Sequence, residues 1–152
     1  MKIHQILVLA ALVACATAKP KPAPAPAAPA PEPPKSLYER LGGQAGIEAV
    51  VGQLVANVGA DPRINYFFGL TDIGGLRDHL VAFVCVASGG PCQYRGRSMG
   101  EAHRGLGITG AQFDALVEDL VKALDQFHVG EREKGELLAT LGPLKPQIVE
   151  AH

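Results

Sequence analysis

Two kinds of side chain in this 152-residue sequence could carry out chemistry, histidine and cysteine. One of the five histidines, His103, lies between the glycine-rich segment Gly89-Gly90-Pro91 and a helix start at Thr109. A neutral imidazole in such a place could bind a metal ion. A single histidine beside apolar residues is also commonly a hydrogen-bonded structural residue. The residue type alone therefore leaves both interpretations open.

The three cysteines fall in two separate parts of the chain. Cys85 and Cys92 bracket a short glycine-containing segment, and outside the cytoplasm such a pair is most simply a disulfide. That bond would fix the ends of the loop that leads toward His103. A metal site formed with His79 is the alternative, although no fourth ligand has a recognisable spacing.

The third cysteine, Cys15, belongs to an export signal that we assign to residues 1–18. A basic start is followed by an apolar run, Ile6 to Cys15, that is too short to span a bilayer. Two processing sites compete. Ala16-Thr17-Ala18 fits an ordinary cleavage site, whereas Leu12-Val13-Ala14-Cys15 resembles a bacterial lipobox, in which Cys15 would be lipidated. The alternative is that Cys15 is only an apolar residue of the signal-peptide core. Both sites predict an exported protein, and the lipobox predicts a periplasmic or outer-membrane lipoprotein of a bacterium.

Residues 19–35 alternate proline with alanine, and we expect an extended spacer there, because proline fixes φ and supplies no backbone N–H. Residues 36–152 then form one domain. The formal net charge is −1 and no basic run occurs, so nucleic acid is excluded as a partner. The only expected membrane attachment is the possible lipid anchor.

The domain is predicted to be all-α, because apolar residues recur at helical spacing and no strand-like alternation of any length appears. Capping boxes at Ser36/Glu39 and Thr109/Gln112 mark two helix starts. In the first half of the domain we expect a short helix stopped at Gly42-Gly43, a helix through 47–58 and a helical turn through Asn65. A loop from Gly69 to Gly75 then leads to a helix from Leu76 to Ala87. A long helix from 110 to 127 follows, and a last helix from about Gly130 is broken or bent by Pro143 and Pro146.

Several short segments stand in a characteristic order and spacing, namely Leu37-Tyr38-Glu39-Arg40-Leu41-Gly42-Gly43, Asp61-Pro62-Arg63-Ile64-Asn65-Tyr66-Phe67-Phe68, Gly89-Gly90-Pro91, Tyr94-Arg95-Gly96, Met99, His103, Leu106-Gly107-Ile108-Thr109 and Phe113-Asp114. Together they resemble a group I truncated haemoglobin along nearly the whole domain. That resemblance implies a two-over-two helical sandwich that holds haem b, with His103 as the proximal iron ligand and Phe68 packed on the porphyrin.

The distal side departs from the family. Where relatives commonly place a tyrosine that hydrogen-bonds O2, this chain has Val55, and the supporting glutamine positions read Leu76 and Leu80. The polar cage is missing, which predicts weak O2 retention or faster oxidation of the iron and puts nitric-oxide dioxygenation in doubt. The expected haem-contacting set is completed by His79, Tyr94, Met99, Arg97 and Phe113, with Arg95, Arg97 and Arg104 as candidates to meet the propionates.

The first functional hypothesis is an exported haem protein, expected to be monomeric and without enzymatic activity, that binds a diatomic gas opposite His103, first of all oxygen, with NO or CO as alternatives. The second is an electron-transfer or redox-sensing protein in which His79 is a second iron ligand, as the resemblance to some cyanobacterial members implies. The third is a haem-dependent NO dioxygenase or peroxidase, although the pocket lacks an obvious acid–base pair. A redox partner is implied but not identified.

Overall fold

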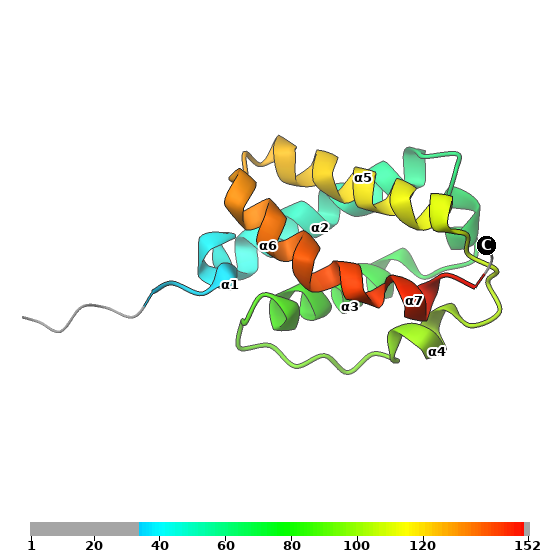
Figure 1. Ribbon diagram of the computed structural model, residues 1–152, viewed down its shortest axis with the longest axis horizontal. Coiled ribbons are helices and arrows are strands. Elements are labelled where there is room, and N and C mark those ends of the chain that lie inside the picture. Colours follow the sequence, from blue (N-terminus) through cyan, green and yellow to red (C-terminus); the bar gives the residue numbers. More distant parts are fainter. Residues whose placement is uncertain (1–33, 151–152) are drawn as a thin grey trace, which may run out of the picture. The chain divides into compact units, whose positions relative to one another are not determined.

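The computed structural model describes residues 34–150, and every regular element in that range is a helix (Figure 1). The predicted signal peptide and nearly all of the proline-rich spacer lie outside the described residues. Within them, no helix combines the length and the apolar character needed to cross a bilayer. The elements are α1 (Leu37–Arg40), α2 (Gly43–Ala60), η1 (Asn65–Phe68), α3 (Ile73–Ala87), α4 (Met99–His103), α5 (Gly110–Gln126), α6 (Glu131–Leu141), η2 (Gly142–Leu144) and α7 (Lys145–Ile148).

The helix α2 is the centre of the packing. It contacts both α3 and α5, while α6 reaches α1 and α3 (Figure 1). The buried face of α2 carries Ile47, Val51 and Leu54. Leu124 of α5 and Leu137 of α6 belong to the same core. Burying this apolar surface stabilises the fold at about 25 cal/mol per Å². The predicted all-α class and the arrangement of two helix pairs are therefore confirmed.

Local capping signals set where several helices begin. The hydroxyl of Ser36 accepts the Glu39 N–H, and that of Thr109 accepts the Gln112 N–H, with the side chain of the third residue reaching back in each case. These are the two capping boxes expected from the sequence. Near the other end, Pro143 divides the last helical segment into α6, η2 and α7, as predicted.

Several element boundaries differ from the sequence prediction, and α2 runs from Gly43 to Ala60 rather than from 47 to 58. The helix α3 begins at Ile73 rather than Leu76, because the Asp72 carboxylate accepts the Gly74 N–H at 3.1 Å and caps the helix earlier. The helical turn after Pro62 runs on as η1 through Phe68. The long helix α5 ends at Gln126, and Phe127, expected on its apolar face, is 44% exposed.

Candidate functional site

His103 is the last residue of the short helix α4. This helix starts at its own capping box, in which the Ser98 hydroxyl accepts the Glu101 N–H and the Glu101 carboxylate accepts the Ser98 N–H. The imidazole Nδ1 lies 2.8 Å from the carbonyl oxygen of Met99. A carbonyl only accepts, so Nδ1 carries the hydrogen, and in the neutral imidazole Nε2 then has the free lone pair. The half-buried ring is thereby oriented as a metal ligand needs.

The apolar residues predicted to contact the cofactor come from five different elements. Those predicted for the distal side, on α2 and α3, have hydrocarbon side chains and offer no hydrogen-bond donor. Three of the set pack against the central core, namely Val55, Phe68 and Leu80, whereas Leu76, Met99 and Phe113 are half-buried outside it. Half-buried hydrocarbon surface of this kind suits a flat apolar cofactor, which would remove it from water.

His79 lies on the exposed surface of α3. Its Nδ1 donates to the Gly75 carbonyl, one turn earlier in the helix, at 2.8 Å. Its ring meets the edge of Tyr94 at a centroid distance of 6.4 Å, and Tyr94 also packs edge-on against Phe83 at 5.3 Å. These contacts tie the imidazole to its own helix and to the loop before α4.

The loop between α3 and α4 holds Tyr94, Arg95 and Arg97, and Arg104 directly follows α4. The Tyr94 hydroxyl donates to the carbonyl of Arg97 at 2.8 Å, which fixes the backbone one residue before the α4 cap. The side chains of Arg95, Arg97 and Arg104 are exposed. The Arg95 guanidinium donates to the Gln93 amide oxygen at 3.0 Å, and none of the three forms an ion pair with a carboxylate among the described residues. Guanidinium groups of this kind suit carboxylates such as the haem propionates.

Cys85 and Cys92 form a disulfide, as the sequence predicts, with their Cα atoms 5.9 Å apart. Because both sulfurs are bonded to each other, the alternative metal site with His79 is wrong. Among residues 34–150, no group of three histidine, cysteine or acidic side chains could hold a metal ion. A cross-link closing so short a loop is expected to stabilise the fold by about 2–3 kcal/mol.

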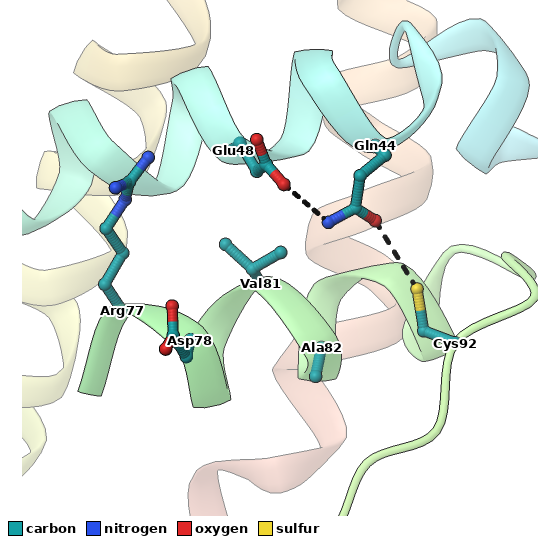
Figure 2. A pocket seen from close by; sticks show the side chains of 7 residues that line it. All are labelled: Gln44, Glu48, Arg77, Asp78, Val81, Ala82 and Cys92. Carbon is teal, nitrogen blue, oxygen red and sulfur yellow. Dashed lines mark hydrogen bonds between the residues drawn. The ribbon is translucent and has the colours of Figure 1, made fainter. Parts of the chain in front are cut away.

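A separate hollow of about 350 Å³ lies between α2 and α3 (Figure 2). Of the α3 residues that line it, Asp78, Val81 and Ala82 lie on the side of that helix away from Leu76 and Leu80, and Arg77 lies between the two sides. Gln44 donates to Glu48 there at 2.8 Å, and its carbonyl oxygen lies 3.6 Å from the Cys92 sulfur, which has no hydrogen to donate. This polar hollow is distinct from the predicted cofactor site. Its lining consists of Gln44, Glu48, Arg77, Asp78, Val81, Ala82 and Cys92.

A short helix that ends on a half-buried, oriented histidine, in an all-α domain that also carries the predicted apolar contact residues, is the arrangement expected of a globin-type haem protein. The family model of the bacterial-like globins matches residues 36–150. The chain therefore belongs to the globins, in their group 1 truncated haemoglobin branch. Haem is the cofactor of this family.

Relatives of known sequence or structure support this assignment. The group 1 truncated haemoglobin of Mycolicibacterium paratuberculosis is 36% identical over 76% of this chain and 85% of its own length. The group 1 truncated haemoglobin of Synechocystis is 39% identical over 70% of this chain and 90% of its own length. The crystal structure of the ferric truncated haemoglobin from Tetrahymena pyriformis superposes with a TM-score of 0.74 at 30% identity, covering 76% of this chain and 98% of that one. The 2/2 haemoglobin of Synechococcus, solved with covalently attached haem, gives 0.68 at 37% identity, with 71% and 91% covered.

Sequence reasoning located His103 but missed the helix that carries it. The available signal was Ser98 followed three residues later by Glu101, which is a capping box like the two that were recognised.

Proposed function

We propose that this chain binds haem b through Nε2 of His103 and holds a small diatomic gas on the opposite face of the iron. The observation that carries the proposal is the hydrogen bond from His103 Nδ1 to Met99, because it leaves Nε2 as the coordinating nitrogen. Bound haem supplies an iron centre with one open coordination position. The exposed arginines of the α3–α4 loop and the Tyr94 region meet the propionates, and Phe68 packs on the macrocycle.

The gas is of the class that needs no hydrogen bond from the protein, namely CO or NO in preference to O2. Dioxygen on ferrous iron acquires negative charge and gains about 1.5–3 kcal/mol from a charge-assisted hydrogen bond. Val55, Leu76 and Leu80 cannot supply one. Carbon monoxide and nitric oxide acquire less charge, so an apolar wall costs them less.

We expect the ferrous protein to be five-coordinate and its spectrum to be unchanged by His79→Ala. His79 is exposed and its ring packs against Tyr94 of the α3–α4 loop, so we expect its Nε2, which the Gly75 bond leaves as free as that of His103, to stay off the iron. The test is the visible spectrum of the haem-loaded full chain, ferric and dithionite-reduced, for wild type and variant, followed by CO addition.

Sharp low-spin bands in both oxidation states, converted to high-spin by His79→Ala, would reject an open site. That result would establish His79 as a second iron ligand and favour electron transfer or redox sensing. Failure of the purified chain to take up haem would reject the haem-binding proposal itself.

We also propose that the protein is exported and lipidated at Cys15. The Cys85–Cys92 disulfide supports export, because such bonds persist in oxidising compartments. Mass spectrometry of the mature protein is expected to find a diacylglycerol-modified Cys15 as the first residue, and Cys15→Ser is expected to abolish the modification. A mature protein that begins at Lys19 would show ordinary cleavage after Ala18 and contradict the lipoprotein assignment.

A further inference from the structure

Glu150, the last described residue, is hydrogen-bonded to the loop that follows His103. Its carboxylate accepts the Gly105 N–H at 2.8 and 3.0 Å from the two oxygens, and the Gly107 N–H at 2.8 Å. Its own N–H donates to the carbonyl of Ile108 at 2.9 Å. Glu150, a single residue beyond the end of α7, is thus hydrogen-bonded to three residues of the segment between the predicted iron ligand and α5.

The backbone of this loop is shaped to receive a carboxylate. Gly105 and Gly107 have φ values of +80° and +64°, a conformation that glycine adopts without strain. Their N–H groups converge on the one side chain. These two hydrogen bonds are the main cause of a lowered pKa for Glu150, so the group that the loop receives at neutral pH is a carboxylate anion.

The end of α4 is also held by one backbone hydrogen bond from this loop and by packing on α7. The only backbone hydrogen bond from this loop back to His103 is that of the Leu106 N–H to its carbonyl, at 3.2 Å. The helix α4 otherwise packs on α7, where Gly100 lies close to the Gln147 carbonyl. The segment from α7 to Glu150 therefore supports α4 from one side and fixes the loop beyond it.

We propose that Glu150 is a positioning residue for the proximal histidine. By holding the loop after α4, it fixes the position and tilt at which the His103 imidazole meets the haem iron. The inference rests on the proposed function, because it takes His103 as the iron ligand. The Glu150 carboxylate is hydrogen-bonded to the backbone of Gly105 and Gly107 and not to the imidazole, so it acts through this loop.

The test measures haem dissociation and the iron–histidine stretching band of the ferrous full-length protein by resonance Raman spectroscopy. In Glu150→Ala, we expect dissociation to accelerate about 10- to 100-fold, the range for losing a group that orients a metal ligand, and the band to shift or broaden. Glu150→Gln keeps an amide oxygen and is expected to restore both readouts in part. Glu118→Ala, which removes an exposed carboxylate paired with Arg63, is the matched control and should change neither.

An unchanged iron–histidine band in Glu150→Ala would overturn the proposal. It would do so even if haem dissociated faster, because a general loss of stability would account for that. An unchanged dissociation rate would overturn it as well. Failure of the proposed function is recognised separately, with the variant His103→Gly. If the proposed function is wrong, His103→Gly retains haem normally. If only the positioning role of Glu150 is wrong, His103→Gly loses haem while the Glu150 variants behave like wild type.

Discussion

Replacing His103 with glycine is expected to lower haem affinity by more than about 100-fold. Loss of a group that merely orients a metal ligand already costs 10- to 100-fold, and His103 is the ligand itself. Glycine leaves a space where the imidazole was, so millimolar imidazole added to His103→Gly is expected to bind there and restore a five-coordinate ferrous spectrum. Haem titration of the apoprotein, with and without imidazole, measures both effects.

The control is another histidine that makes no contact with the site. His128 is exposed and has a φ of 55°, which asparagine tolerates, so His128→Asn should leave haem affinity unchanged. If His103→Gly bound haem as tightly as wild type, the hydrogen bond between His103 and Met99 would have only a structural role. The histidine would then be the hydrogen-bonded structural residue that its type alone also allows.

The parts of the fold that sequence analysis predicted are those determined by neighbouring residues. The apolar spacing of α2 and α5 and the capping boxes at Ser36 and Thr109 act within a few residues, and the structure confirms them. The start of α3 was misplaced because two glycines favour a loop by propensity, while a single hydrogen bond from Gly74 to Asp72 decides the boundary.

Contacts between distant segments of the chain cannot be read from neighbouring residues in the sequence. Glu150 meets Gly105 and Gly107 across separations of 45 and 43 residues, and its partners are backbone N–H groups, which every glycine in the chain also has. The orientation of His79 was likewise unpredictable, because spacing places it beside the Leu76 face, whereas its contact with Tyr94 depends on how the α3–α4 loop folds back. The disulfide was predictable because only two cysteines in the domain could pair.

The missing distal donor gives the second large expected effect. Introducing a hydroxyl with Val55→Tyr is expected to slow O2 dissociation from the ferrous protein by roughly 10- to 100-fold, since a charge-assisted hydrogen bond is worth about 1.5–3 kcal/mol and each 1.4 kcal/mol is tenfold. Val55 is half-buried and packs against the core. Carbon monoxide acquires less charge on iron, so its dissociation should change far less. Stopped-flow or flash-photolysis kinetics with both gases measure the difference.

Val55→Phe is the matched control, because it adds the same ring without the hydroxyl and so separates the hydrogen bond from the added bulk. If both variants slow O2 dissociation equally, the ring alone is responsible and polarity at this position has no part in choosing the gas. If neither variant changes O2 dissociation while wild type already retains O2 tightly, another group supplies the donor, and His79 on α3 is the residue to substitute next. A selective effect of tyrosine on O2 would show that the hydrocarbon wall of this chain, rather than its iron ligand, determines which gas it holds.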